Sequence, residues 1–380
     1  MEYKRLGDYI RPVDVRNREL KVTKPMGINI DKHFMPSVAN VIGTDMSTYK
    51  LVSKNQFACN LMHVGRDEKI PMAMHTDDNP IIVSPAYFVF DIVKTQELLP
   101  DYLMMWFRRS EFDRNAWFYT DADVRGGMSK DALLDMRLPI PSINRQREIV
   151  SEYETLSNRI RLNEQMIANL EETAQALYRK MFVDGVDKEN LPEGWRKGKL
   201  GDFGNVITGK TPSTFDEDNF GDYMPFVTIP DMHDGCFVIK TERMLSEKGV
   251  KSQVNKTVPQ NSICVSCIGT SGLVIITTQE CQTNQQINTI VLKNPKALYY
   301  LYMVCRDLET IITEYGMGAA VLNNLNKKEF ESLMAIIPSN DVLCESYNYL
   351  RPLFDEIYMC QQENEKLTEL QSLLLVRMGK

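Results

Sequence analysis

Residues 149–181, IVSEYETLSNRIRLNEQMIANLEETAQALYRKM, form the longest regular pattern in this chain of 380 residues. Apolar side chains recur at alternating spacings of four and three, which is the heptad pattern of a long helix with a narrow apolar seam. One seam position is polar, and a single helix cannot bury such a seam, so the pattern predicts a partner helix. The seam consists of Ile149, Tyr153, Leu156, Ile160, Asn163, Ile167, Leu170, Ala174, Leu177 and Met181.

The same heptad pattern recurs 197 residues later, in a less apolar form. Its asparagine stands one seam position further along, and Pro352 predicts a kink or a late start of the regular helix. We expect the two helices to pair as an antiparallel coiled coil, although each could instead only cap its own domain. The second seam consists of Ser346, Leu350, Leu353, Ile357, Cys360, Asn364, Leu367, Gln371, Leu374 and Met378.

The blocks before the two helices are also related. RLGDYI at 5–10 returns as KLGDFG at 199–204, and RLPIPS at 137–142 returns as MAIIPS at 334–339. Such self-similarity indicates two copies of one structural unit. In each copy we expect strands followed by a short helix, because β-branched and aromatic residues precede a compact apolar stretch. The expected strands cover 79–92 and 261–278, and the short helices cover 99–112 and 296–312.

These patterns predict an α+β chain with two similar mixed α/β domains, each followed by a long helix. The predicted order is a first domain, a first helix, a linker, a second domain and a second helix, at 1–141, 142–182, 183–194, 195–338 and 339–380. The first helix would extend about 50 Å from Ile149 to Met181 at about 1.5 Å per residue, which is roughly one and a half turns of B-DNA.

Antiparallel pairing gives each helix position a defined opposite. If Asn163 faces Asn364, then Ile149 faces Met378 and Met181 faces Ser346. A buried asparagine pair is a known means of fixing the register of a coiled coil. Our hypothesis is that this pair fixes the register here; the alternative is that both side chains face solvent as breaks in the seam.

The composition is that of a soluble globular protein, with 43% hydrophobic and 25% charged residues. No apolar run reaches the length of a membrane span, and the N-terminus lacks the apolar core of a secretion signal. Eight cysteines without short spacings are typical of free thiols in a reducing cytoplasm. The net charge of −7 argues against nucleic-acid binding. However, much of the acidity lies in 141–194 and 336–380, and the two larger blocks outside these segments are near neutral. DNA binding by those blocks therefore stays open.

One motif suggests nucleotide hydrolysis. GNVITGKT, residues 204–211, satisfies the spelling of a phosphate-binding loop. Such a loop requires an apolar strand before its first glycine and a helix that begins at its lysine. The preceding residues are charged, and Pro212 falls where the helix should continue. We therefore reject a nucleotide site, while Lys210, Thr211 and Ser213 remain able to contact phosphates.

Other catalytic patterns also fail. SPAY at 84–87 resembles a methyltransferase signature but carries Ala86 where a proline is needed, so we expect an edge strand. PDMHDGCFVIK at 230–240 lacks a nuclease carboxylate, because Val238 occupies its place. Cys264 and Cys267 alternate like strand residues and have no second pair for zinc. We find no metal site or catalytic constellation and expect a non-catalytic chain.

The chain resembles the specificity subunits of type I restriction-modification systems. The resemblance spans the chain and is clearest in the second half, while the first half lacks a GKTPS equivalent and matches through LGDYI, NLMHVGRDEKIPMAM, VSPAYFVF and RLPIPSINRQREIV. The second half matches through LPEGWRKGKLGDFGNVITGKTPS (191–213), GDYMPFVTIPDM (221–232), TNQQINTIVL (283–292) and LNNLNKKEFESLMAIIPS (322–339).

The resemblance implies two target-recognition domains that each read one half of a split, asymmetric DNA site. The paired helices would act as a spacer and as the docking surface for two methylation subunits, and restriction subunits would complete the complex. Methyl donor, ATP and magnesium would be bound by those partners, with no cofactor in this chain. A helix-pairing scaffold that never reads DNA remains the alternative.

The candidate DNA contacts are polar residues in predicted turns beside strands, because amide and cationic side chains read base edges and hold phosphates. For each of them a solvated surface role stays open, and TNQQIN could instead serve the domain core. The candidates are Arg66, Lys69 and Arg125 in the first half, and Lys210, Thr211, Ser213, Lys251, Asn255, Asn284 and Gln285 in the second.

Overall fold

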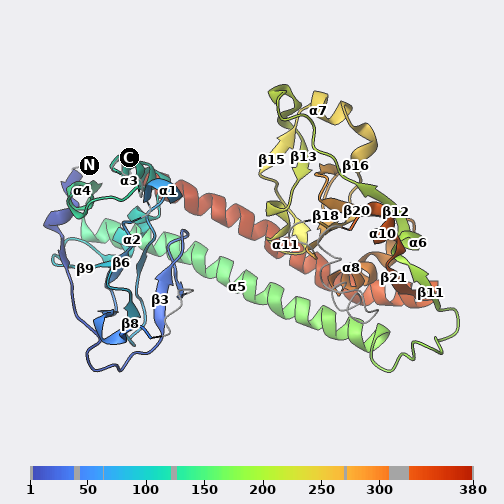
Figure 1. The fold of residues 1–380 in the computed structure, drawn as a ribbon, viewed down its shortest axis with the longest axis horizontal. Helices are drawn as coiled ribbons and strands as arrows, with labels where there is room; N and C mark the ends of the chain where they lie inside the picture. Colours follow the sequence, from blue (N-terminus) through green and yellow to red (C-terminus); the bar gives the residue numbers. More distant parts are fainter. Residues whose placement is uncertain are drawn as a thin grey trace. The chain divides into compact units, whose positions relative to one another are not determined.

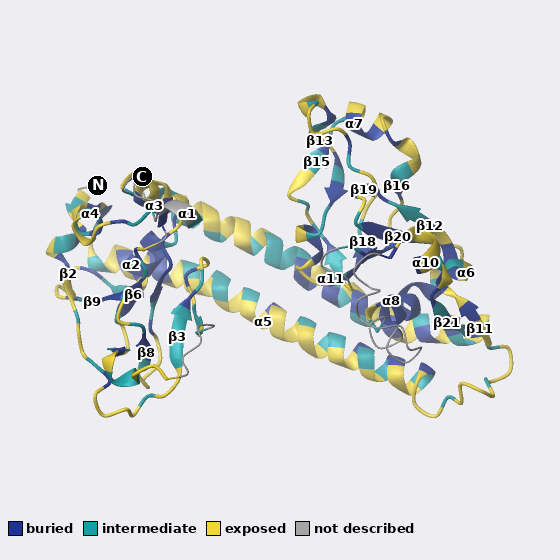
Figure 2. Ribbon diagram, viewed as in Figure 1, coloured by how far each residue is buried: buried dark blue, intermediate teal, exposed yellow. Residues whose placement is uncertain are grey.

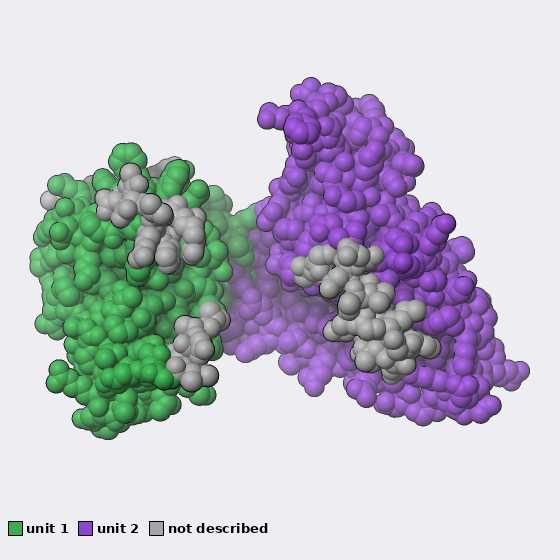
Figure 3. Space-filling view, in the orientation of Figure 1, with its two compact units in different colours: residues 1–159, 367–380 green, residues 160–366 purple. Residues whose placement is uncertain are grey.

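The computed structural model describes residues 3–37, 43–62, 64–120, 126–268, 272–307 and 325–378. The chain forms two compact units (Figures 1 and 3). Unit 1 comprises residues 1–159 with 367–380, and unit 2 comprises residues 160–366, so each long helix contributes to both units. Within the described ranges, no helix is both long and apolar enough to cross a membrane.

Unit 1 begins with β1 (Tyr3–Arg5), which pairs antiparallel with β10 (Arg137–Pro139) and sets Arg5 opposite Arg137. Two four-stranded sheets follow, in the orders β2-β9-β6-β7 and β4-β3-β8-β5. Their strands are β2 (Ile10–Pro12), β3 (Pro25–Ile28), β4 (Phe34–Pro36), β5 (Lys50–Val52), β6 (Phe57–Cys59), β7 (Met72–Met74), β8 (Ile81–Val83) and β9 (Phe88–Ile92). The short helices are α1 (Val64–Asp67), α2 (Pro100–Phe107), α3 (Ser110–Phe118) and α4 (Lys130–Asp135).

The core of unit 1 lies between the first sheet and α2. Phe57 of β6 stacks on Phe90 of β9 with ring centroids 5.1 Å apart, and Phe107 of α2 meets Phe57 edge-on. Tyr102, also in α2, donates its hydroxyl hydrogen to the Pro139 carbonyl at 3.1 Å. All four side chains are buried, and this burial is the main stabilising term for the sheet and helix together.

Unit 2 repeats this plan. Strand β11 (Arg196–Lys199) pairs antiparallel with β21 (Met334–Ile337) and sets Lys199 opposite Met334. Its sheets run β12-β20-β17-β18-β14 and β15-β13-β19-β16. The strands are β12 (Gly204–Thr208), β13 (Phe220–Val227), β14 (Phe237–Val238), β15 (Arg243–Leu245), β16 (Thr257–Val258), β17 (Ile263–Ser266), β18 (Val274–Thr277), β19 (Cys281–Thr283) and β20 (Ile287–Leu292). The short helices are α6 (Leu200–Phe203), α7 (Glu247–Lys251), α8 (Leu298–Arg306) and α10 (Lys327–Ser332).

The predicted duplication is confirmed strand by strand. The order β2-β9-β6-β7 in unit 1 corresponds to β12-β20-β17-β18 in unit 2, which carries β14 as an extra edge strand. The predicted strand regions 79–92 and 261–278 each contain two strands. The single short helix predicted at 99–112 is divided in the structure, because α2 ends at Phe107 and α3 begins at Ser110. The helix predicted at 296–312 corresponds to α8, and residues 308–312 lie outside the described residues. Helix α8 is buried over nearly its whole length (Figure 2).

The long helices are α5 (Ile143–Phe182) and α11 (Asn340–Arg377), and they pair antiparallel. In unit 1, Ile149 and Met378 share the hydrophobic core. There Gln371 Nε2 also donates to Ser157 Oγ at 2.7 Å. In unit 2, the Cys360 thiol lies 3.8 Å from the Met166 sulfur. Both polar contacts lie within one residue of the register expected from the heptads, and the predicted α+β fold with an antiparallel helix pair is confirmed.

Two local expectations are corrected by the structure. Of the two effects predicted for Pro352, a kink or a late start, the late start is wrong, because helix α11 begins at Asn340 and runs through Pro352. Its missing N–H leaves one carbonyl unpaired, and the exposed position lets water satisfy that group. SPAY is not an edge strand but the turn between β8 and β9, where the Tyr87 amide donates to the Ser84 carbonyl at 3.0 Å. Pro85 suits the second position of such a turn.

Candidate nucleic-acid interface

The GNVIT segment is a strand and not a phosphate-binding loop. Residues 204–208 form β12, which pairs antiparallel with β20 along its whole length. A Cβ at position 204 would lie 2.1 Å from the Val291 carbonyl oxygen, so glycine is required there by the neighbouring strand. Lys210 lies outside any helix. The sequence-based rejection of a nucleotide-binding loop at this segment is therefore confirmed.

The glycine before Lys210 is required by a second close approach. The Gly209 amide donates to the Ile287 carbonyl, and the Lys210 amide donates to the Thr283 carbonyl at 2.9 Å. A Cβ on Gly209 would lie 2.2 Å from the Asn284 carbonyl oxygen and 2.3 Å from the Thr283 carbonyl oxygen. The loop of residues 209–213, which we call the GKT loop, is thus held directly against the turn between β19 and β20.

Two buried glutamines join a third segment to the GKT loop. Gln253 Nε2 donates to the Lys210 carbonyl at 2.7 Å and to Gln282 Oε1 at 2.8 Å. Gln282 in turn donates to Thr257 Oγ1 at 2.9 Å. Because both side chains are buried, these bonds are shielded from competing water and hold the three segments rigidly. Sequence analysis missed both glutamines, since no local pattern marks them.

Some of the candidate residues of unit 2 are exposed to solvent, while others form hydrogen bonds or ion pairs within the protein. Lys210, Ser213, Asn255 and Gln285 are exposed around this framework. Thr211 donates to Gln285 Oε1 at 2.6 Å, which orients the amide and leaves its two N–H groups free to donate outward.

Two other candidates have partners within the protein. Asn284 is only 8% exposed and exchanges hydrogen bonds with Gln286. Lys251 forms an ion pair with Glu247 at 2.9 Å. The exposed apolar residue beside the GKT loop is Phe215, at 101% relative exposure, and sequence analysis did not select it.

In unit 1 the structure describes fewer of the predicted contacts. Lys69 is exposed just after α1. The backbone of Arg66 belongs to α1, but its side chain lies outside the described part of the chain, as does Arg125 entirely.

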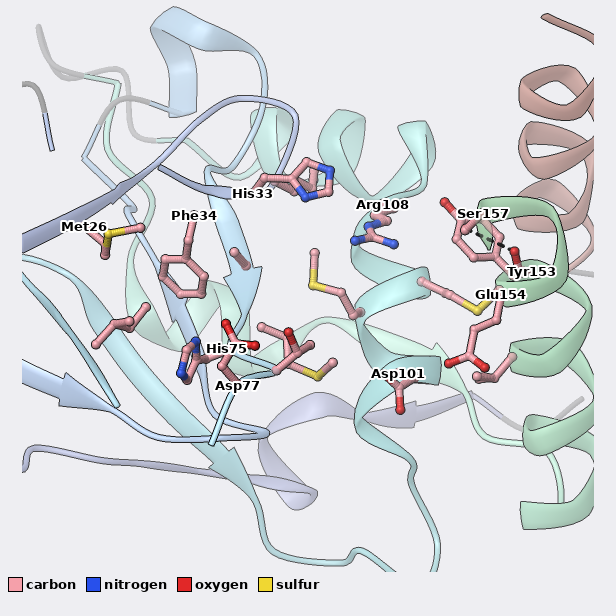
Figure 4. Close-up of a pocket in the computed structure, with 18 residues that line it drawn as sticks. Met26, His33, Phe34, His75, Asp77, Asp101, Arg108, Tyr153, Glu154 and Ser157 are labelled. Carbon is pink, nitrogen blue, oxygen red and sulfur yellow. Dashed lines mark hydrogen bonds between the residues drawn. The ribbon is translucent and has the colours of Figure 1, made fainter. Parts of the chain in front are cut away.

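Unit 1 also contains a cavity of about 470 Å³ between the sheets, α2 and the first part of α5. Figure 4 shows Arg108 directed into this space, with His33 and Phe34 on one side and Tyr153 on the other. Sequence analysis counted Arg108 only as part of a helix and did not select His33. Their proximity results from tertiary packing, and no local motif could have indicated it.

The two seam asparagines meet in unit 2. Asn163 is fully buried, and its Nδ2 donates to Asn364 Oδ1 at 2.9 Å and to Glu363 Oε2 at 2.8 Å. Its own Oδ1 is buried without a hydrogen-bond partner. The structure therefore brings the predicted pair together on the inner side of the helix pair and adds a carboxylate to it.

The segments tested for catalysis have structural roles where the chain is described. Asp231 accepts hydrogen bonds from the Thr228 amide and hydroxyl and from the Glu242 amide, which organises a loop. Cys264 lies within β17 and Cys267 directly follows it, and both thiols are buried. Among the described residues, no group of three or more His, Cys, Asp or Glu side chains is arranged to hold a metal ion.

Comparison with known proteins adds family relationships to this geometry. Residues 192–369 match the family model described as the type I restriction modification DNA specificity domain. The chain is 37% identical over 216 residues to the HindI specificity subunit of Haemophilus influenzae, covering 56% of this chain and 47% of that protein. It is 30% identical over 118 residues to the MjaIX specificity subunit of Methanocaldococcus jannaschii, covering 30% and 27% of the two chains. The match thus spans about half the length of the first relative and about a quarter of the second.

A solved structure shares the whole fold. The S subunit of a type I restriction-modification system from M. genitalium aligns with a TM-score of 0.60 and 10% identity, covering 100% of this chain and 96% of that one. This identity is low enough that the similarity concerns the fold alone. Residues 192–369 are therefore similar to the DNA specificity domain of type I restriction-modification systems, and the chain as a whole shares the fold of an S subunit.

Proposed function

We propose that this chain gives a type I restriction-modification complex its DNA sequence specificity. Each unit would read one half of a split, asymmetric duplex target, and the paired helices would set the spacing between the halves. The observation that carries this proposal is the duplicated sheet arrangement, in which each copy is followed by one long helix. Two different surfaces on one repeated framework suit a target with two unlike halves.

The framework around the GKT loop supports DNA contact in unit 2. Lys210 and Ser213 are exposed on a loop that backbone and glutamine hydrogen bonds hold in place. Cations and hydroxyls on rigid loops are suited to phosphate contacts, while an oriented amide such as that of Gln285 can meet a base edge. We assign the proposed phosphate contacts to Lys210 and Ser213, and a polar groove contact to Gln285.

The helix pair would dock the methylation subunits, of which we propose two per chain. In unit 1 an apolar groove of about 390 Å³ is lined by Leu156, Leu370, Leu373 and Leu374. Leu373 is 58% exposed, which is unusual for a seam-flanking leucine. An apolar helix face of a partner would cover this groove. Restriction subunits would join the same complex.

We further propose that catalysis belongs to those partners. They would bind the methyl donor, ATP and magnesium, while this chain would hold no cofactor and position the DNA. The match of residues 192–369 to the family model of a DNA specificity domain supports a recognition role for the chain.

Mapping methylated adenines in host DNA with and without this chain tests the proposal. Loss of one split methylation motif on deletion, with return on complementation, is the expected result. An unchanged methylation pattern in a strain whose methylation subunits are expressed would overturn it. Binding of duplex DNA by the complex with methylation subunits should weaken steeply with salt, whereas a scaffold that does not touch DNA would show no such dependence.

A further inference from the structure

The cavity of unit 1 has walls of opposite charge. One part is lined by Arg108 and His33, and another by Asp77, Asp101 and Glu154. Figure 4 shows Arg108 and His33 in the upper part of the view and the carboxylates of Asp101 and Glu154 below Arg108. A ligand that fits both regions must offer an anion at one end and hydrogen-bond donors at the other.

Arg108 is the principal free cation of this cavity. It caps the C-terminal end of α2, and its guanidinium carbon lies 5.9 Å from the ring centre of Tyr153. Among the described residues no carboxylate forms an ion pair with it. Partial burial and the neighbouring Arg108 charge lower the pKa of His33, so its imidazole is neutral near pH 7 and able to donate one hydrogen bond.

The neighbouring Lys32 does not compete for the anion. Its ammonium group is buried, 2.6 Å from Asp113 Oδ1 and 2.7 Å from the Phe107 carbonyl. Its charge is therefore compensated inside the protein, and the group serves to join the β3–β4 turn to α2 and α3. That connection holds His33, the next residue in the chain, at the mouth of the cavity.

The volume and the aromatic walls limit the ligand class. About 470 Å³ lies within the usual range for small-molecule sites. Half-buried rings of Phe34 and Tyr153 lie on opposite sides of the space (Figure 4). Aromatic rings combined with an arginine and hydrogen-bonding groups are typical of sites that hold a nucleobase by stacking.

We propose that this cavity binds a single nucleotide, with its phosphate at Arg108 and His33 and the amino group of its base at the carboxylates. Carboxylates accept hydrogen bonds from amino-bearing bases such as cytosine. This inference rests on the proposed function, because the nucleotide would come from a DNA strand held by the complex. A free nucleoside monophosphate has the same chemistry, so the experiment includes both sources.

The first experiment measures binding by calorimetry on the complex of this chain with its methylation subunit. The probes are dAMP, dCMP and dTMP, followed by single-stranded oligonucleotides of each base. Arg108→Gln should weaken binding of the preferred probe at least tenfold, because a charge-assisted contact is lost. Arg114→Gln, which removes an exposed arginine of α3 in the same unit, should leave it unchanged, and Arg108→Lys should restore part of the affinity.

The second experiment tests the orientation of the nucleotide. Asp101→Asn combined with Glu154→Gln should weaken binding of amino-bearing dAMP and dCMP and leave dTMP little changed, because the carboxylates act as acceptors. If the double variant strengthens all three probes equally, the carboxylates only repel phosphate and the proposed orientation is wrong.

Binding of oligonucleotides but not of monophosphates would support a strand-borne nucleotide, and binding of both would support the site for either source. No Arg108-sensitive binding of any probe would overturn the inference. The proposed function would survive that result if the complex still bound its duplex target and still lost affinity on Lys210→Ala. It would fail separately if the wild-type complex did not bind duplex DNA at all.

Discussion

Asn163 and Asn364 share a hydrogen bond across the helix pair, with 2.9 Å between Nδ2 and Oδ1. Asn163 is fully buried, and the pair is joined by Glu363, whose carboxylate accepts the second hydrogen of the same amide. The pair forms only when the two helices are aligned, because the one-heptad slip that sets Gln165 opposite Asp355 would place Asn163 opposite Ile357 and Asn364 opposite Leu156. The pair therefore has the geometry required to fix the register.

Replacing both asparagines with leucine should loosen the register without unfolding the helices. Leucine restores the apolar seam, so the melting temperature should stay equal or rise, while slipped pairings are no longer penalised. Cysteines at Gln165 and Gln362, in a background with Cys344→Ser, would be joined by a short bis-maleimide in the native register.

In the double-leucine variant the yield of this cross-link should fall. A second cysteine pair, Gln165→Cys with Asp355→Cys, reports a slip of one heptad, and its cross-link should appear in that variant. Equal cross-linking in both backgrounds would show that the asparagines do not set the register. Asn163→Ala alone should lower stability by about 2 kcal/mol, because it leaves a cavity and unpaired partners.

Lys210→Ala should weaken DNA binding by the assembled complex about equally for target and non-target sequences. Lys210 is exposed on the GKT loop, and a phosphate contact carries no base information. The slope of log affinity against log salt should fall in magnitude by about 1. The matched control is Lys328→Ala, an exposed lysine of α10, which should change neither quantity. A loss confined to the target sequence would contradict a phosphate role.

Gly209→Ala should destabilise unit 2 and displace the GKT loop. The added Cβ would lie within 2.3 Å of two carbonyl oxygens of the β19–β20 turn, and both are backbone atoms that cannot move aside alone. Overpacking of this kind costs about 1–3 kcal/mol. Gly27→Ala is the control, because its Cβ would be no closer than 3.8 Å to a neighbouring atom. Chemical denaturation followed by fluorescence would compare the two, and equal stability would refute the close approach.

One thiol should react in the native chain and eight after unfolding. All eight cysteines lie in the described residues; Cys344 is exposed and the other seven are buried. Burial raises the pKa of the Cys264 thiol to about 12 and that of Cys267 to about 11, so little thiolate is present at pH 8. Titration with a chromogenic disulfide reagent, with and without denaturant, counts the reactive thiols of the native and the unfolded chain. Cys344→Ser should abolish the native reaction, and any remaining fast thiol would contradict the described burial.

The sequence by itself determined the duplication, the two long helices and their relative register. These features depend on repeated local patterns, and a heptad seam specifies a facing seam with little help from distant residues. The two strand regions and the short helices were predictable for the same reason. The late helix start predicted at Pro352 was wrong because an exposed helix position can accommodate a proline. The edge strand predicted at SPAY was wrong because a proline favours a turn as readily as a strand edge.

Only the tertiary structure decided which polar residues share a site. Gln253 and Gln282 meet because β19 lies between β13 and β16 in one sheet. Arg108 lies beside His33 because a buried ion pair between Lys32 and Asp113 joins a strand turn to two helices. These contacts connect residues that are far apart along the chain and carry no periodic signal. Their physical basis is the packing of the sheets, which brings distant segments together and excludes the water that would otherwise satisfy their polar groups.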